Sequence, residues 1–211
     1  MAAHARLGLA TTSTYDDDGP AARAGADRLG AAPRPVDLEA LVDDPAVWLV
    51  HTHERPGADH WPAIVLVRDG RDALVSRAHQ VVEMGWHETF RVALDWLITR
   101  PLKPDNPSSG TWGGNVLAWL GRSSAASFVR FEDLVDRPDE VVDGALAAAG
   151  VVVAAGGAGA VPGFAELHAH DPGFFRRGVV GSYLDEMPDD LHDRFWSVDD
   201  NAEAMRRLGY G

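Results

Sequence analysis

The sequence predicts an α/β protein with a mostly parallel central sheet flanked by helices. Short apolar runs rich in β-branched residues have the length of buried strands, and they occur at 47–52, 63–67 and 127–131. Longer segments carry apolar residues at helical spacing, and they occur near 72–83, 87–98, 111–121 and 139–150. This order of strands and helices favours parallel strands joined by helical crossovers.

The chain from Ala63 onward is interpreted as a strand, a tight turn and a helix. Arg68 ends the strand, and the helix begins at about Asp72. A helix that starts beside the carboxyl edge of a strand presents free N–H groups and a positive dipole end, which suit an anion. The guanidinium of Arg68 and the hydroxyl of Ser76 are expected to converge there. The simpler interpretation is an ordinary strand–helix unit in which Arg68 pairs with Asp69 or Asp72.

The composition limits the possible functions. The 211 residues include no cysteine, which excludes disulfides and cysteine nucleophiles and makes an intracellular, cytoplasmic location the expectation. The net charge is −13, so a broad surface for nucleic acid is not expected. No apolar run approaches the ~18 residues that cross a bilayer, so no membrane partner is expected. Residues 1–35 show little periodicity and are expected to be irregular, which leaves a single α/β domain over 36–211.

Three histidines lie around the end of the strand predicted at 47–52. His51 and His53 share one side of an extended chain, and His60 follows them. A metal site is one alternative, although no carboxylate stands at a convincing spacing. A neutral imidazole at the carboxyl end of a strand also suits proton abstraction near neutral pH, which makes His53 a candidate base. A hydrogen-bonded structural histidine is the simpler interpretation.

Arg176 and Arg177 lie between an aromatic pair and a glycine-rich turn, in the segment FFRRGVVGSY. A pair of arginines is usually part of a solvated surface. The flanking aromatics and glycines favour instead a loop that is held down and presents its guanidinium groups to a phosphate. Because the chain is acidic and Lys103 is its only lysine, an anionic ligand needs such a local concentration of arginines.

From about Val47 to the C-terminus, the chain resembles the cytosolic-type sulfotransferases in five segments that follow the family's order. IVLVRDGRDALVS is similar to the family's 3′-phosphate segment, with Arg68 and Ser76 at the expected spacing. HTHERP is similar to the Lys-Thr-His loop, with His53 at the place of the catalytic histidine. FFRRGVVGSY resembles the Arg-Lys-Gly-x-x-Gly segment that clamps the 3′-phosphate. TWGGNVLAWL and FVRFEDLVDRP resemble the Trp-containing helix and the strand with its Glu-Asp-Leu segment.

The resemblance implies a three-layer fold related to the P-loop NTPases and a defined reaction. The sulfuryl group of 3′-phosphoadenosine 5′-phosphosulfate (PAPS) passes to a hydroxyl of a small-molecule acceptor, with His53 as the general base and no metal. As in phosphoryl transfer, positioning and charge stabilisation dominate. The residues implied in donor binding are Arg68, Ser76, Phe164 (which packs against the adenine), Arg176, Arg177 and Gly178.

The chain departs from the family pattern at two places. The 5′-phosphosulfate loop, which resembles Pro-Lys-Ser-Gly-Thr-Thr-Trp, is not found, and residues 5–19 resemble the sequence that follows this loop in bacterial relatives. We therefore expect the first strand and its loop to be missing, through a misplaced start, a truncation or a loss. His51 occupies the lysine position of the histidine loop, where a neutral imidazole gives no permanent charge and weaker transition-state stabilisation.

Three other functions remain open on the sequence. A non-catalytic or truncated nucleotide-binding remnant would account for the missing loop. A P-loop kinase or NTPase needs a Gly-rich loop that ends in Lys-Ser/Thr, which the sequence lacks. A metal-dependent hydrolase would use His51, His53 and His60.

Overall fold

The computed structural model describes residues 10–13, 38–44, 47–58, 60–102, 107–151, 163–173 and 175–211. The chain divides into two compact units. The first unit comprises Met1–His53 and Arg137–Gly178, and the second comprises Glu54–Asp136 and Val179–Gly211. Lys103, the aromatic Phe174 and most of the segment 1–35 lie outside the described residues.

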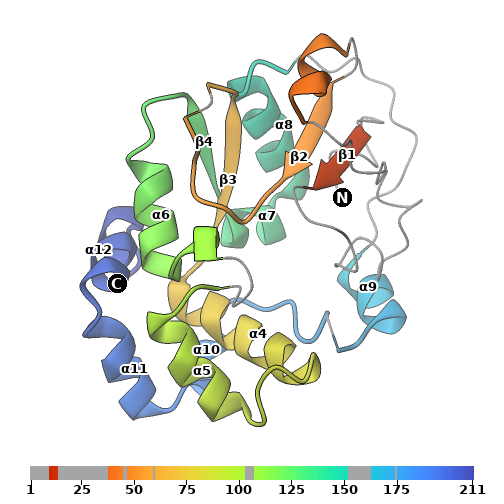
Figure 1. The fold of residues 1–211 in the computed structure, drawn as a ribbon. Helices are drawn as coiled ribbons and strands as arrows, with labels where there is room; N and C mark the ends of the chain where they lie inside the picture. The colour runs from red at the N-terminus through yellow and green to blue at the C-terminus, as the bar shows by residue number, and fades with distance from the viewer. Residues whose placement is uncertain are drawn as a thin grey trace. The chain divides into compact units, whose positions relative to one another are not determined.

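In the part of the first unit that the structure describes, there are one pair of parallel strands and two α-helices. Its elements are β1 (Ala10–Ser13), the 3-10 helix η1 (Leu38–Asp43), β2 (Trp48–His51), α8 (Pro138–Ala148) and α9 (Phe164–His170). Strands β1 and β2 lie side by side (Figure 1), with Ala10 opposite Trp48 and Ser13 opposite His51. The strand β1 falls inside the N-terminal segment for which no regular element was predicted.

Among the described residues, the second unit contains another parallel strand pair and most of the helices. Its elements are β3 (Ala63–Val67), α4 (Gly70–Glu83), α5 (Phe90–Thr99), the 3-10 helix η2 (Pro107–Ser109), α6 (Trp112–Leu120), β4 (Ala126–Arg130), α7 (Phe131–Asp136), α10 (Tyr183–Glu186), α11 (Asp189–Trp196) and α12 (Asp199–Leu208). The register places Ala63 of β3 opposite Ala126 of β4, and Val67 opposite Arg130.

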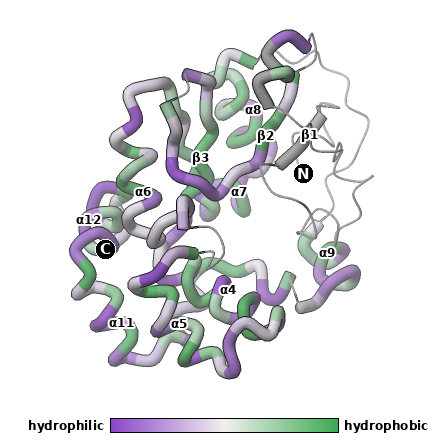
Figure 2. The backbone as a smooth tube through the Cα atoms, in the orientation of Figure 1, coloured by the Kyte–Doolittle hydropathy of each residue, from purple (hydrophilic) through white to green (hydrophobic). Residues whose placement is uncertain are grey.

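The core of the second unit is formed by helices that bury one apolar face each. Helix α4 packs against α5, α6 packs against α12, and α11 packs against both α5 and α12. Leu74, Leu94, Phe195 and Met205 are fully buried at these contacts. Hydrophobic and hydrophilic stretches alternate along α4 and α5 (Figure 2), as amphipathic helices at the edge of a core require.

Polar caps explain where α4, α5 and α6 of the second unit begin. The Asp69 carboxylate accepts from the N–H of Arg71, so α4 begins at Gly70 rather than at about Asp72 as predicted. Thr89 and Thr111 cap α5 and α6 in the same manner. Each side-chain oxygen pairs with an N–H group that has no partner inside its helix, which fixes the start of that helix.

The predicted mixed α/β class with parallel strands is confirmed. The strand at 63–67 has the predicted bounds, and β2 and β4 differ from theirs by one residue at each end. Within the described residues, the strands form two separate parallel pairs, β1 with β2 and β3 with β4. No helix among the described residues is long and apolar enough to cross a membrane.

Candidate functional site

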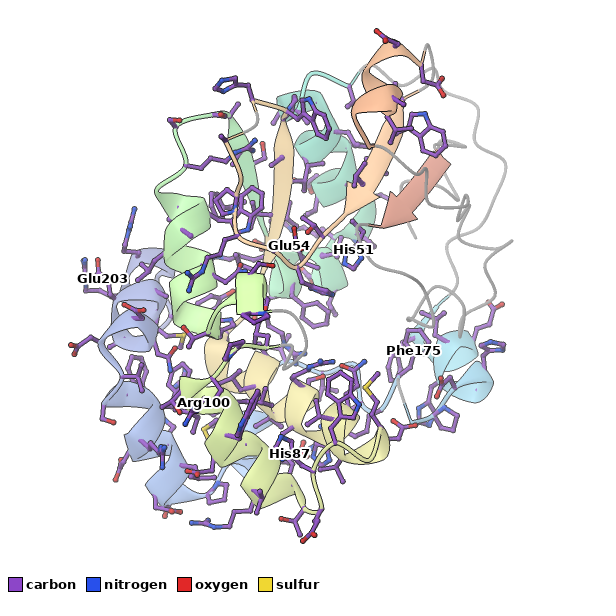
Figure 3. The ribbon with its side chains drawn as sticks, viewed as in Figure 1. His51, Glu54, His87, Arg100, Phe175 and Glu203 are labelled. Atoms are coloured by element: carbon purple, nitrogen blue, oxygen red, sulfur yellow. The ribbon has the colours of Figure 1, made fainter. Side chains whose placement is uncertain are left out.

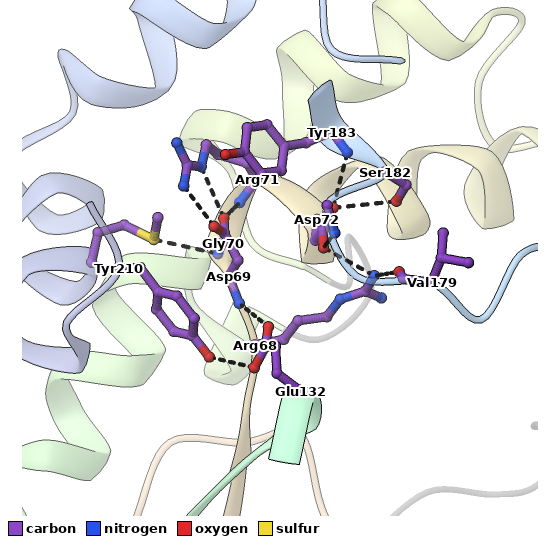
Figure 4. Close-up of polar contacts among 12 residues, drawn as sticks. Arg68, Asp69, Gly70, Arg71, Asp72, Glu132, Val179, Ser182, Tyr183 and Tyr210 are labelled. Atoms are coloured by element: carbon purple, nitrogen blue, oxygen red, sulfur yellow. Dashed lines mark hydrogen bonds and ion pairs between the residues drawn. The ribbon is translucent and has the colours of Figure 1, made fainter. Parts of the chain in front are cut away.

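Arg68 follows β3 at the turn into α4, and two acceptors hold its side chain (Figure 4). Its Nη2 donates to the Val179 carbonyl at 2.8 Å and to the Asp72 carboxylate at 3.2 Å. The guanidinium carbon lies 4.5 Å from the centre of the Phe131 ring, in a cation–π arrangement. The side chain is 19% exposed, and its Nε has no hydrogen-bond partner among the described residues. The predicted pairing with Asp72 is therefore confirmed, and the Nε of Arg68 is a buried donor without a hydrogen-bond partner among the described residues.

Asp72 connects the first turn of α4 to the segment that follows Val179. Its side chain is fully buried. The carboxylate accepts from the N–H of Gly181 at 2.7 Å, from the N–H of Tyr183 at 2.9 Å and from the Ser182 hydroxyl at 3.2 Å. Because buried carboxylates need such partners, one residue fixes both the Arg68 guanidinium and the turn that leads into α10.

Asp69 and Arg71 form a buried ion pair at the same turn. Arg71 donates from Nε and from Nη2 to the two oxygens of Asp69, at 3.0 and 2.6 Å. The Arg71 guanidinium also lies 4.0 Å from the centre of the Tyr183 ring and 5.4 Å from that of Trp196. Burial opposes the charge of Arg71, but the hydrogen bond and the charge of Asp69 outweigh it, and the pKa of Arg71 lies above its ordinary value. This pair stiffens the start of α4.

Glu132 links the turn to the end of the chain. One of its oxygens accepts from the N–H of Asp69 at 3.3 Å, and the other accepts from the Tyr210 hydroxyl at 2.6 Å. Burial, followed by the hydrogen bond to Glu132, raises the pKa of Tyr210 well above its ordinary value. A cavity of about 300 Å³ adjoins this network, and both Tyr183 and Tyr210 line it. All of these groups belong to the second unit.

Ser76 lies two turns into α4 and is exposed. Residues four apart share one face of a helix, so Ser76 stands on the same face as Asp72, which binds Arg68. Ser76 therefore lies one helical turn after the residue that binds Arg68, and its convergence with the Arg68 guanidinium stays a prediction.

The first unit contains the other predicted donor-binding residues, and two of them touch. The backbone of Gly178 lies so close to the Phe164 ring that a Cβ added at Gly178 would be 2.3 Å from Cδ2 of Phe164. His168, one turn further along α9, stacks on Phe164 at 5.7 Å and donates from Nδ1 to the Phe175 carbonyl at 2.6 Å. These contacts hold α9 against the loop that carries Arg176, which is half-buried, and Arg177, which is exposed.

Replacing Gly178 with alanine is expected to destabilise this contact by about 1–3 kcal/mol, because the new Cβ meets the Phe164 ring and because Gly178 has φ +61°, which other residues rarely adopt. Hydrogen exchange of the α9 amide groups measures the effect. Gly163→Ala is the matched control, because a Cβ at that position meets no atom within 4 Å. Equal protection of α9 in the two variants would contradict the prediction.

His51 and His53 lie at the end of β2, and Figure 3 shows His51 projecting from the strand. Both are exposed, and their rings meet edge to face with centroids 4.6 Å apart. Glu54, the next residue in the chain, is anchored within the second unit. Its carbonyl accepts from the Trp119 indole N–H at 3.0 Å, and its carboxylate accepts from the Ser108 hydroxyl at 3.3 Å. The backbone immediately after His53 is thereby restrained.

Sequence reasoning missed three contributors to these contacts: the capping role of Asp72 toward residues 181–183, the linking role of Glu132, and Tyr210. Each depends on contacts between residues far apart in the chain, which periodicity does not reveal. The contact between His168 and Phe164 could have been predicted from the sequence, because the two residues stand four apart on a helix. Trp112, considered above only as a residue of a resembling segment, is 6% exposed and packs in the core against Phe195.

Among the described residues, no group of three His, Cys, Asp or Glu could hold a metal ion.

Comparison with known proteins identifies the fold. No model of a known protein family matches the sequence, and no curated protein matches it. Among solved structures, the chain is similar to the crystal structure of mouse sulfotransferase SULT7A1 complexed with PAP. The two share 18% sequence identity, and the match has a TM-score of 0.59 and covers 94% of this chain and 83% of the mouse chain. The chain therefore has a sulfotransferase-like α/β fold, as predicted.

Proposed function

We propose that this protein is a sulfotransferase that moves the sulfuryl group of PAPS to a hydroxyl of a small-molecule acceptor. The observation that carries the proposal is the way in which the Arg68 guanidinium is held by neighbouring acceptors. Asp72 and the Val179 carbonyl hold its guanidinium at the carboxyl end of β3, while Nε has no partner among the described residues. An arginine immobilised in this way suits a phosphate group, because little side-chain entropy is lost on binding. The sulfotransferase-like fold supports the same interpretation, and the mouse relative was crystallised with PAP.

Each unit contains residues to which this proposal gives a role in donor binding. In the second unit, Arg68 and Ser76 of the β3–α4 junction are the proposed 3′-phosphate ligands. In the first unit, Arg176 and Arg177 of the loop before Gly178 are the proposed donor-binding arginines. Phe164 packs against the adenine. The tight contact between Phe164 and Gly178 supports this role, because it fixes one face of the ring and leaves the side chain 43% exposed. Val179, whose carbonyl accepts from Arg68, is the next residue after Gly178 in the chain.

His53 is the proposed general base. The acceptor oxygen attacks sulfur and loses its proton to His53, while the bond between sulfur and the bridging oxygen breaks and adenosine 3′,5′-bisphosphate (PAP) leaves. Exposure of the imidazole and the restraint on the following residue, Glu54, favour this assignment. No metal takes part in this scheme. His51 supplies less positive charge than a lysine would at that position.

Calorimetric titration with PAP, followed by a transfer assay with PAPS and a panel of small hydroxylated compounds, tests the proposal. We expect PAP to bind the wild type and to bind Arg68→Ala at least tenfold more weakly, because a charge-assisted phosphate contact is lost. His53→Ala is expected to bind PAP normally and to lose transfer. Arg207→Ala removes an exposed arginine of α12 and serves as the control. No PAP binding by the folded wild type would overturn the proposal. Binding of PAP without any transfer would mean that the protein binds the nucleotide but is not a sulfotransferase.

A further inference from the structure

A chain of hydrogen bonds runs from Tyr210, near the end of the chain, to the residue that follows Arg68. The Tyr210 hydroxyl donates to Oε2 of Glu132 at 2.6 Å, and Oε1 of Glu132 accepts from the N–H of Asp69 at 3.3 Å (Figure 4). The peptide group whose N–H is held in this way joins Asp69 to Arg68. Glu132 is therefore a bridge with both oxygens occupied, one toward the turn and one toward Tyr210.

Tyr210 itself is firmly placed. Gly209 adopts φ +73° at the end of α12 and turns the chain, and the N–H of Tyr210 then donates to the Met205 carbonyl at 2.9 Å. The guanidinium of Arg130 lies 4.8 Å from the centre of the Tyr210 ring and donates to the Leu208 carbonyl. A side chain restrained at its backbone and on its ring can orient the carboxylate that it binds.

The carboxylate of Glu132 accepts from the N–H of the peptide between Arg68 and Asp69. The other contacts at this turn do not involve that peptide N–H. The Asp69 side chain binds Arg71, and the Arg68 side chain binds Asp72 and the Val179 carbonyl. Without the Tyr210 hydroxyl, Glu132 keeps one partner and gains freedom to rotate. The backbone that carries Arg68 then loses part of its orientation, while the core helices keep their contacts.

We propose that Tyr210 is a positioning residue for phosphate recognition by Arg68, acting through Glu132 and the N–H of Asp69. The inference rests on the proposed function, because it assigns Tyr210 to the same PAP site. Tyr210 touches no ligand in this scheme. Its contribution is to hold the β3–α4 turn in the orientation in which the guanidinium meets the 3′-phosphate.

The test compares Tyr210→Phe with Tyr183→Phe in calorimetric titrations with PAP and with adenosine 5′-monophosphate, which lacks the 3′-phosphate. Both tyrosines line the same cavity, and Tyr183 keeps its ring over Arg71 in the phenylalanine variant. We expect Tyr210→Phe to reduce the preference for PAP over the monophosphate by about three- to tenfold, the range for one lost hydrogen bond. Tyr183→Phe is expected to leave the preference unchanged. A general loss of stability would weaken the binding of both ligands equally and would leave the ratio of the two affinities unchanged.

Two further comparisons separate the positioning role from the proposed function. In an Arg68→Ala background, Tyr210→Phe is expected to have no additional effect on PAP binding, because the two residues act through one contact. In the ligand-free protein, Tyr210→Phe is expected to shift the NMR signals of the Asp69 amide and of the Arg68 Nε–H group. Unshifted signals, or an unchanged PAP preference in a protein that binds PAP, would overturn the positioning role. Failure of the wild type to bind PAP would overturn the proposed function instead.

Discussion

Asp72→Ala is expected to lower the free energy of unfolding of the second unit by about 3–5 kcal/mol, the cost of breaking a buried ion pair from one side. The substitution removes the acceptor of the N–H groups of Gly181 and Tyr183 and of the Ser182 hydroxyl. Within the described part of the chain, it leaves Arg68 the Val179 carbonyl as its hydrogen-bond acceptor. Each buried donor left without an acceptor costs roughly 1–3 kcal/mol. The losses are not additive, because the segment relaxes toward water once it is released.

Urea unfolding followed by tryptophan fluorescence measures this effect, because every tryptophan except Trp48 lies in the second unit. Asp193→Ala is the control, since Asp193 is an exposed carboxylate on α11. Asp72→Asn keeps an acceptor oxygen and loses the charge, so it is expected to fall between the wild type and the alanine variant. An Asp72→Ala protein as stable as the control would contradict the role assigned to this residue.

Gly113→Ala is expected to destabilise the second unit by about 3 kcal/mol, at the upper end of the usual cost of overpacking. The new Cβ would lie 2.5 Å from the backbone carbonyl carbon of Asp200 and 2.6 Å from the backbone nitrogen of Asn201. These are main-chain atoms of α12, so rotation of a side chain does not relieve the clash, and α6 must move away. That movement also breaks the hydrogen bond from the Gly113 N–H to the Asn201 side chain, now at 3.2 Å.

The neighbouring glycine provides the matched control. A Cβ at Gly114 meets Oγ1 of Thr111 at 2.9 Å and Nη2 of Arg55 at 3.0 Å, and both atoms belong to side chains that can shift. The same urea measurement is therefore expected to show a clearly smaller loss for Gly114→Ala. Equal losses in the two variants would mean that the α6–α12 contact is not limited by main-chain distance.

Local pattern predicted the elements well where apolar residues decide the structure. The strand Ala63–Val67 has the predicted bounds, because its apolar run and its flanking residues agree. The strand Ala10–Ser13 was missed because its sequence, ATTS, is short and polar and is defined by its pairing with β2. Phe131 was assigned to the preceding strand but begins helix α7.

The candidate site was predictable only in its separate parts. Arg68, Ser76 and the segment from Phe175 to Gly178 stand out by residue type and by the family resemblance. The residues that orient them do not stand out, because a buried aspartate or a tyrosine has no local signature. Asp72 meets Gly181 across 109 residues of chain, and Glu132 meets Tyr210 across 78. Only the fold brings such partners together, and no periodicity in the sequence encodes them.

The second unit is assembled from two stretches of chain, and this has a consequence for how the protein forms during synthesis. The segment Glu54–Asp136 must wait for Val179–Gly211 before Asp72, Glu132 and the core face of α6 find their partners. At ~5–20 residues per second, the ribosome leaves the early stretch incomplete for several seconds. During that interval the apolar faces of α4, α5 and α6 are open to wrong contacts, and closure of such distant pairs is intrinsically slow. The yield of folded protein should therefore respond to translation speed and to chaperones that shield the incomplete core.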